Sequence, residues 1–285
     1  MNIAFLDFWE YPKPFDPNNN FLTNLLRLSK NINIVGPNEA DLIIYSCFGN
    51  ENKRYNHCKK IFYTGECIRP DYNQCDYSIT FDFDNYGDKN IRIPLWYFYI
   101  DWFSVKTYGN PDYLIPVNYL TGENEFTKKE KSKFCSAVFS QNRDDIRFDF
   151  VNRLKSYKDV DCYGKIHVNS LPDGERYKMD IISDYKFNMC FENTIYPGYF
   201  TEKLLHAKIA GCVPLYYSDK SYSTDFNSKC CINLIEFENQ ESFIEYIKEI
   251  DSDYSLYQKI CKEPLFESIP DLSDLIKSLS KIIEI

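Results

Sequence analysis

Residues 187–217 read FNMCFENTIYPGYFTEKLLHAKIAGCVPLYY, in which two apolar runs enclose a helical pattern. The runs at residues 187–191 and 213–217 are typical of buried strands, and the helix expected over residues 201–210 ends at Gly211. Parallel strands need a crossover between them, and a helix of this kind supplies one. The segment therefore predicts an α/β fold built on a parallel sheet.

The same alternation of strand and helix fills most of the chain before this segment. The nearer series is expected to contain strands at residues 134–140 and 160–163 and helices at residues 144–157 and 175–183. The first third of the chain is expected to contain a helix at residues 21–29 and strands at residues 3–8, 31–35, 41–47 and 61–63.

A polar, lysine-rich break at residues 121–133 (TGENEFTKKEKSK) separates the two series. We therefore expect one domain over residues 1–120 and a second over residues 134–265, followed by a C-terminal helix at residues 266–285. Two α/β halves of this kind leave a cleft between them. Ligands of open parallel sheets bind at the C-terminal ends of the strands.

The composition excludes several functions. Acidic residues outnumber basic ones by 42 to 33, and the net charge of −9 does not suit a nucleic-acid-binding surface. We expect no transmembrane segment and no signal peptide, because long apolar runs and a basic start are lacking. Eleven scattered cysteines without a Cys-x-x-Cys pair favour reduced thiols in a cytoplasmic protein, soluble or peripheral to a membrane. A zinc site of Cys58, Cys67 and Cys75 is the weaker alternative, because their spacing is long and irregular.

The start of the helix at residues 201–210 is a candidate anion site. Thr201 is the expected N-cap, and the backbone N–H groups at a helix start suit a diphosphate, with Lys203 beside them. Glu202, between Thr201 and Lys203, is close enough to this anion site to form hydrogen bonds with hydroxyl groups of a ligand. In the alternative interpretation, Glu202 and Lys203 are ordinary surface residues of a first helical turn.

The pattern FENxxxxxYxTEKLxxAxxxGxVPxY at residues 191–216 resembles the donor-binding signature of the α1,3/α1,4-fucosyltransferases of glycosyltransferase family 10. Residues 81–84 (FDFD) with residues 91–97 (IRIPLWY), and residues 140–154 with residues 160–164, are similar to other parts of that family. The resemblance implies a GT-B architecture of two Rossmann-like domains facing across a cleft. The C-terminal domain would hold GDP-fucose, and the N-terminal domain would hold most of the oligosaccharide or glycoconjugate acceptor.

The resemblance also implies roles for individual residues. The positions that would contact the donor are Arg147 and Lys203 at the diphosphate and Asn193, Tyr199 and Glu202 at the ribose or the fucose. Glu66, in Tyr63-Thr-Gly-Glu-Cys, matches the family's general base. These roles suit inverting transfer, because a carboxylate can take the acceptor proton while fixed cations stabilise the departing diphosphate.

Further residues are candidates for parts of the same chemistry. Arg143 is a reserve for the phosphate role, and Trp96 or Tyr97 is a candidate for stacking on the acceptor sugar. His206 lacks an evident partner and is expected to be a packed or surface residue. Asp82-Phe-Asp84 has the Asp-x-Asp form of a metal site, but we interpret it as loop chemistry and expect no metal or other cofactor to be required.

The sequence thus predicts an inverting, metal-independent α1,3-fucosyltransferase. It would move L-fucose from GDP-fucose to an N-acetylglucosamine hydroxyl of a lactosamine-type glycan, in the biosynthesis of Lewis-antigen-type structures. The alternatives are an inactive GT-B-fold protein that binds sugar nucleotides or glycans, and a GT-B transferase that uses another donor, such as GDP-mannose or a UDP-sugar. The acceptor and the choice between α1,3 and α1,4 linkage stay open.

Overall fold

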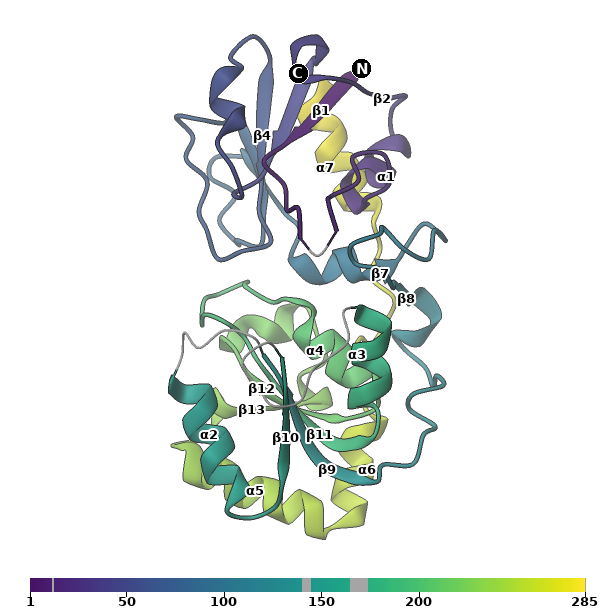
Figure 1. Ribbon diagram of the computed structural model, residues 1–285, viewed down its shortest axis with the longest axis vertical. Helices are drawn as coiled ribbons and strands as arrows, with labels where there is room; N and C mark the ends of the chain where they lie inside the picture. Colours follow the sequence, from purple (N-terminus) through teal and green to yellow (C-terminus); the bar gives the residue numbers. More distant parts are fainter. Residues whose placement is uncertain (12, 140–144, 165–173, 285) are drawn as a thin grey trace. The chain divides into compact units, whose positions relative to one another are not determined.

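The computed structural model describes residues 1–11, 13–139, 145–164 and 174–284, and the chain divides into two compact units (Figure 1). Met1–Pro116 and Pro270–Ile285 form the first unit, and Val117–Ile269 form the second. Each unit has its own parallel sheet and its own buried apolar core. The expected α/β class is therefore confirmed.

The first unit is built on a six-stranded parallel sheet with the order β2-β1-β3-β4-β5-β6. Its strands are β1 (Asn2–Leu6), β2 (Asn33–Ile34), β3 (Leu42–Tyr45), β4 (Lys59–Tyr63), β5 (Tyr77–Thr80) and β6 (Asn90–Arg92). The order reverses direction between β1 and β3, and open sheets bind ligands beyond the C-terminal strand ends at such a switch point. A short parallel pair, β7 (Ile100–Asp101) and β8 (Ile115–Pro116), follows the sheet.

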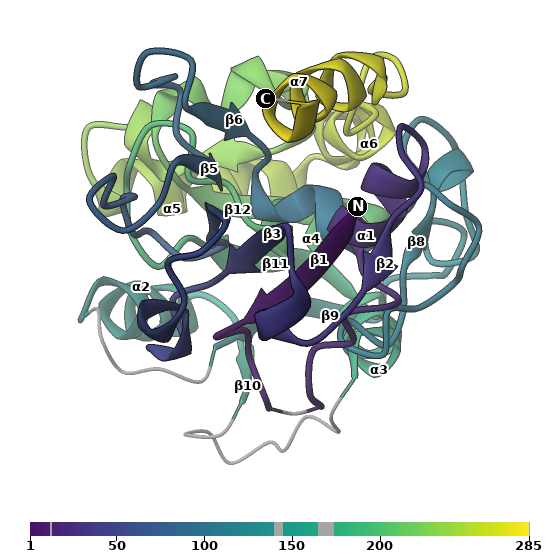
Figure 2. The same cartoon turned by 90° about the horizontal axis from the view of Figure 1, so that it is seen from above.

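Two helices from opposite ends of the sequence pack together in the first unit. Helix α1 (Phe21–Arg27) begins after Asn20, whose side chain accepts the Thr23 N–H at 2.9 Å. Helix α7 (Ser273–Glu284) lies beside α1 and adds Leu279 to the same core (Figures 1 and 2). We expected a C-terminal helix at residues 266–285, but the helix begins only at Ser273, and the first unit includes Pro270–Ile285 while the residues up to Ile269 belong to the second unit.

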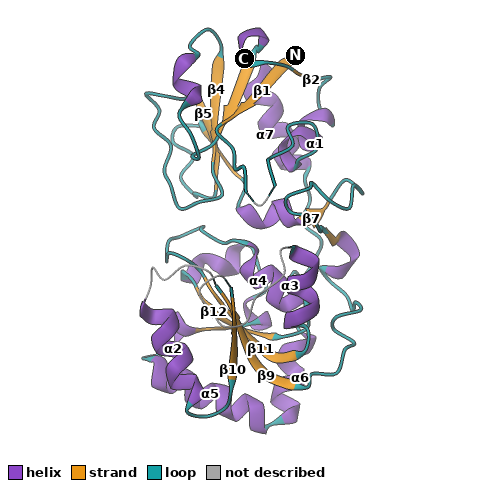
Figure 3. Cartoon of the chain, viewed as in Figure 1, coloured by secondary structure: helices purple, strands orange, loops and turns teal. Residues whose placement is uncertain are grey.

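The second unit has a five-stranded parallel sheet with the order β10-β9-β11-β12-β13. Its strands are β9 (Lys133–Val138), β10 (Val160–Tyr163), β11 (Tyr185–Phe191), β12 (Val213–Tyr217) and β13 (Ile232–Asn233). Its helices are α2 (Asp145–Lys155), α3 (Glu175–Ile182), α4 (Glu202–Ile209), α5 (Gln240–Ser252) and α6 (Tyr254–Lys262), and Figure 3 shows them in purple around the orange strands. The switch point of this sheet lies between β9 and β11.

The predicted elements agree with the observed ones where the apolar pattern is strong. Strands β10 and β12 have the predicted bounds, and α4 is one residue shorter than predicted at each end. Strands β5 and β6 were not predicted, because buried polar side chains interrupt their apolar pattern. Ser78 and Thr80 on β5 both donate to the Asn90 side chain on β6, at 2.8 and 2.9 Å.

The boundary between the units also differs slightly from the prediction. The first domain was expected to end at residue 120, whereas Val117 already belongs to the second unit. Across the residues that the structure describes, no helix is both long and apolar enough to cross a bilayer.

Candidate functional site

The end of β11 and the start of α4 are tied together by one buried carboxylate. Glu192 directly follows β11, and its side chain is 0% exposed. Its Oε1 accepts the Thr201 N–H at 2.8 Å and the Tyr216 hydroxyl at 3.0 Å. Its Oε2 accepts the Thr201 hydroxyl at 2.7 Å and lies 3.2 Å from Lys203 Nζ. These contacts fix the first turn of α4 against the strand end.

Thr201 occupies the N-cap position of α4, as the sequence predicts, but its side chain does not cap the helix. No capping hydrogen bond is formed by its hydroxyl, which donates to Glu192 instead. A hydroxyl caps a helix by accepting a backbone N–H, whereas this hydroxyl donates to an ionised carboxylate, and hydrogen bonds to an ionised group are about twice as strong as neutral ones. The Thr201 side chain therefore serves the buried ion pair rather than the helix end.

Glu202 and Lys203 are not ordinary surface residues, so the alternative interpretation of this turn is wrong. Their side chains are only 15% and 19% exposed, and Lys203 Nζ also donates to Thr201 Oγ1 at 2.9 Å. Burial alone would lower the pKa of Lys203, but the charges of Glu192 and Glu202 outweigh it and raise that pKa above its ordinary value. Lys203 is therefore held as a cation.

Glu202, the neighbour of Lys203, is held in its ionised form as a carboxylate. Burial by itself would raise the pKa of this carboxyl, but the positive charges of Lys203 and Lys178 outweigh burial and hold the pKa below its ordinary range. Lys178 Nζ, on α3, lies 3.6 Å from Glu202 Oε1. Glu202 is therefore an acceptor-only carboxylate at the start of α4.

Arg147 brings α2 to the same strand end. Its side chain is buried, with 3% of the residue exposed, and Nη2 donates to the Phe191 carbonyl at 3.2 Å and to Asn193 Oδ1 at 2.7 Å. The positive charge of Arg147 acts to lower the pKa of Lys203, so the two cations are close enough to interact electrostatically. Arg147, Asn193 and Lys203 thus gather at the C-terminal end of β11, beside the switch point of the sheet.

Tyr199 and His206 are both buried in the second unit. Tyr199 precedes α4 and is bound through its N–H to the Tyr196 carbonyl at 3.1 Å. His206 Nδ1 lies 3.4 Å from Glu175 Oε2, and burial, with Lys178 nearby, lowers the pKa of His206 well below its ordinary value. His206 is therefore a packed, neutral residue, as expected.

Glu66 lies in the first unit, three residues beyond the end of β4, and its side chain is exposed. Its N–H donates to the Thr64 hydroxyl at 2.9 Å, and that hydroxyl donates to the Glu66 carbonyl at 3.2 Å. Thr64 is buried and lies 3.7 Å from the Cys47 thiol, beyond the end of β3. The local backbone around Glu66 is therefore ordered at the C-terminal edge of the first sheet.

Trp96 and Tyr97 differ in how much surface they offer. They lie in the 3-10 turn Leu95–Tyr99 and stack on one another with ring centroids 3.8 Å apart. Trp96 is only 2% exposed, whereas Tyr97 is half-buried. Of the two, Tyr97 has the surface that stacking on a sugar requires. Arg143, the reserve for the phosphate role, lies outside the described residues.

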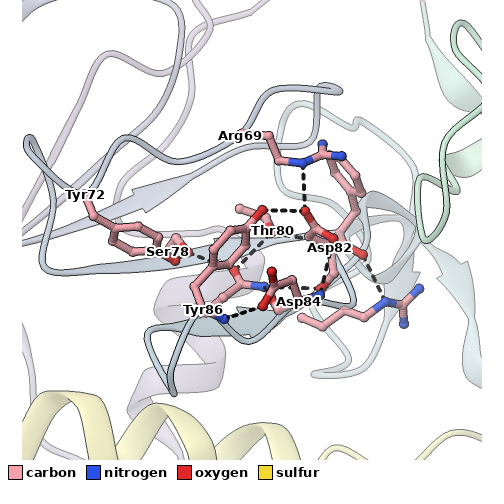
Figure 4. A network of polar contacts seen from close by, with 10 residues as sticks. Arg69, Tyr72, Ser78, Thr80, Asp82, Asp84 and Tyr86 are labelled. Carbon is pink, nitrogen blue, oxygen red and sulfur yellow. Dashed lines mark hydrogen bonds and ion pairs between the residues drawn. The ribbon is translucent and has the colours of Figure 1, made fainter.

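The Asp82-Phe-Asp84 motif orders a loop of the first unit, as Figure 4 shows. Asp82 Oδ2 accepts the Tyr86 hydroxyl at 2.7 Å and lies 2.8 Å from Arg69 Nε. Asp84 Oδ1 accepts the Tyr86 N–H at 2.8 Å. Within the described ranges, no group of three or more His, Cys, Asp or Glu side chains is arranged to hold a metal ion.

Asp82→Asn is expected to lower the free energy of unfolding of the first unit by about 1–3 kcal/mol, because it removes the charge that pairs with Arg69. All three tryptophans, Trp9, Trp96 and Trp102, lie in this unit, so urea unfolding followed by tryptophan fluorescence measures it selectively. Asp88→Asn, at an exposed position of the same loop, is the matched control. Stabilisation by Mn²⁺ that disappears in Asp82→Asn would contradict the loop assignment.

Two family models match this chain. The model of the α-(1,3)-fucosyltransferase FucT N-terminal domain matches residues 3–99, and the model of the glycosyltransferase family 10 (fucosyltransferase) C-terminal region matches residues 127–262. The chain belongs to glycosyltransferase family 10. Its α/β fold is of the GT-B type that this family shares.

Individual members of family 10 agree with this assignment. The α-(1,3)-fucosyltransferase FucT of Helicobacter pylori is 29% identical over 98% of this chain and 63% of its own length. The 3-galactosyl-N-acetylglucosaminide 4-α-L-fucosyltransferase FUT3 of Bos taurus is 34% identical over 45% of this chain and 35% of its own length. This chain thus spans less than two thirds of the length of either relative.

A solved structure of the family extends over the whole chain. The crystal structure of an α1,3-fucosyltransferase with GDP-fucose matches it with a TM-score of 0.76 and 26% sequence identity. The match covers 100% of this chain and 90% of that one. The likeness therefore includes both units and not only the donor-binding signature.

Glu192, which joins the end of β11 to the start of α4, is not among the candidate site residues that the sequence predicts. It lies in the quoted motif between Phe191 and Asn193, and its importance comes from contacts with residues 9–24 positions away. The available signal was a carboxylate directly after a buried strand. A charge in that place needs buried partners, because an unpaired buried charge is strongly unfavourable.

Proposed function

We propose that this chain transfers L-fucose from GDP-fucose to an N-acetylglucosamine hydroxyl of a lactosamine-type glycan, with inversion and without a metal ion. The observation that carries the proposal is the gathering of Arg147 and Lys203 at the end of β11, beside the first turn of α4. Two cations and the N–H groups of a helix start form a site for a diphosphate. The relatives' names support fucose as the sugar.

Arg147 and Lys203 serve the leaving group in this proposal. As the bond between the anomeric carbon and the diphosphate breaks, negative charge grows on the diphosphate oxygens. Cations that are already oriented stabilise this charge more in the transition state than in the ground state. Both side chains are held by fixed protein contacts before the donor binds, so little reorganisation is required.

Glu66 is the proposed general base. Its carboxylate would take the proton of the acceptor hydroxyl as the oxygen attacks the anomeric carbon.

Other residues are proposed to orient the donor and the acceptor sugar. The ionised Glu202 is suited to accept hydrogen bonds from hydroxyl groups of the ribose or the fucose, as is the amide oxygen of Asn193. Tyr199 is the proposed apolar contact of the nucleotide sugar, and Tyr97 that of the acceptor sugar.

We infer a cytoplasmic location as part of the same proposal, because all eleven cysteines are free thiols. The linkage stays a matter for experiment, since the relatives' names include both a 3-α and a 4-α transferase.

The proposal is tested by measuring GDP release from GDP-fucose with and without N-acetyllactosamine, followed by linkage analysis of the product. Acceptor-dependent release with an α1,3-linked product is expected. Tight binding of GDP without release would favour a glycan-binding or nucleotide-binding protein that has lost turnover. Thermal stabilisation by UDP rather than GDP would favour a transferase with a different donor.

A chelator is expected to leave the initial rate of fucose transfer unchanged, because Arg147 and Lys203 supply the positive charge that a divalent ion would otherwise provide. The measurement compares GDP release in EDTA with release in added Mg²⁺ or Mn²⁺. Loss of activity in EDTA that Mn²⁺ restores would contradict the metal-independent mechanism.

A further inference from the structure

We propose that Glu192 is a positioning residue that fixes the Lys203 ammonium and the start of α4 for the donor's diphosphate. This inference rests on the proposed function of Lys203 as a diphosphate ligand. Glu192 itself is not expected to touch the donor, because its side chain is completely buried and both of its oxygens are already bound by protein donors.

Glu192 contacts two parts of the proposed anion site, the Lys203 ammonium and the N-cap residue of α4. Its Oε2 lies 3.2 Å from Lys203 Nζ, and its Oε1 accepts the Thr201 N–H at 2.8 Å, immediately before the first residue of α4. An ammonium group has three N–H donors. Two of them are directed at Glu192 and Thr201, which orients the third relative to the helix start.

The neighbours of Glu192 extend this arrangement to Arg147. The residues on either side of Glu192 in the chain, Phe191 and Asn193, both accept hydrogen bonds from Arg147 Nη2. One short segment at the end of β11 therefore holds both cations, Lys203 through the Glu192 carboxylate and Arg147 through the flanking carbonyl and amide.

The energetic cost of placing the Glu192 carboxylate beside a diphosphate site supports a functional reason for this residue. A carboxylate so close to a diphosphate site repels the ligand, so charge alone makes Glu192 unfavourable for donor binding. A buried ion pair is also weak evidence for stability, because desolvation offsets much of its attraction. Fixing the lysine in one geometry before the donor binds is a benefit that can offset this repulsion.

These two effects predict opposite results for Glu192→Gln, which keeps the shape and removes the charge. If Glu192 acted only through its charge, the affinity for GDP would rise. Positioning predicts instead that the dissociation constant for GDP increases about 10- to 100-fold, because the NH2 group of the amide cannot accept a hydrogen bond, and either the Lys203 ammonium or the Thr201 N–H therefore loses its acceptor. Isothermal titration calorimetry with GDP measures the difference directly, with guanosine as a ligand that lacks phosphates.

The pH dependence gives a second readout that a merely structural role would not move. The Glu192 charge raises the pKa of Lys203, so its removal lowers the pH at which the lysine loses its proton. We expect GDP affinity to fall with rising pH at a lower pH in Glu192→Gln than in the wild type. Guanosine affinity is expected to be unchanged in both proteins.

Three further variants complete the test. Glu192→Asp keeps the negative charge but moves it away from Lys203 by one methylene, so it is expected to weaken GDP binding as well. This variant replaces Glu192→Gln in the test if Glu192→Gln does not fold. Tyr157→Phe removes a hydroxyl hydrogen bond of 3.0 Å to Asp251, a buried carboxylate of the same unit that pairs with Lys158 and Lys186 rather than with Lys203, and GDP affinity is expected to be retained. In a Lys203→Ala background, Glu192→Gln is expected to weaken GDP binding less than it does in the wild type, because only its contact with the start of α4 is left to lose.

The outcomes separate the inference from the function on which it rests. Unchanged or tighter GDP binding in Glu192→Gln, with weakened binding in Lys203→Ala, would overturn the role of Glu192 alone. Equal loss of guanosine and GDP binding in Glu192→Gln would show a general structural role and would also overturn it. A wild-type protein that does not bind GDP would overturn the proposed function.

Discussion

Lys203→Ala is expected to lower kcat/KM for GDP-fucose about 100-fold, because one preorganised cation at a developing oxyanion is worth about 3 kcal/mol. Lys203 is held at the end of β11 by Glu192 and Thr201, so the truncated site cannot recruit another lysine without rebuilding these contacts. Initial rates of GDP release at several donor concentrations, with a fixed concentration of N-acetyllactosamine, measure the effect. The affinity for GDP is expected to weaken in parallel.

The interpretation of this variant requires a measurement of stability, because Lys203→Ala leaves Glu192 buried without its cation. Breaking a buried pair in this way destabilises a protein by about 3–5 kcal/mol. Thermal unfolding therefore has to show that the variant is folded at the assay temperature. Lys248→Ala removes a more exposed lysine, paired with Glu245 on α5, and is expected to keep wild-type kinetics. Wild-type kinetics in a folded Lys203→Ala protein would remove Lys203 from the site.

Glu66→Gln is expected to reduce fucose transfer by about 100- to 10,000-fold and to leave the affinity for GDP unchanged. The lower and upper values are the usual contribution of a general base. The glutamine keeps the backbone contacts with Thr64, which involve the Glu66 N–H and carbonyl rather than the carboxylate. The change therefore removes the proton acceptor without disturbing the segment that carries it.

Glu66→Gln is tested by measuring kcat and the affinity for GDP separately. The rate of GDP release is followed with saturating acceptor, and GDP affinity is measured by calorimetry. Glu51→Gln changes an exposed carboxylate of the same unit, paired with Arg54, and is the matched control. Full activity in Glu66→Gln would show that another carboxylate is the base.

The sequence predicted the second unit in detail because its signals are local. Apolar runs and a helix-ending glycine fixed the bounds of β10 and β12 and the length of α4 to within one residue at each end. Strands β5 and β6 escaped prediction because Ser78 and Asn90 are buried in pairs across the two strands. Such pairing is invisible until the strands are adjacent.

The site was predictable only as far as the family motif extends. The family motif at residues 191–216 pointed to Asn193 and Lys203, the weaker resemblance at residues 140–154 pointed to Arg147, and the structure brings these three residues to the end of β11. Glu192 was missed because its contacts are made across the fold. For the same reason, sequence spacing could not show that Glu202 and Lys203 are largely buried and balanced by neighbouring charges.

The path of the chain between the two units has a consequence for the order of synthesis. The second unit is one continuous segment, whereas the first is completed only when α7 joins α1. On the ribosome, residues 117–269 can collapse while the earlier sheet still lacks the helix that covers part of its core. The half of the protein that is made first is thus the half that finishes last, and until then its uncovered apolar surface is a target for chaperones.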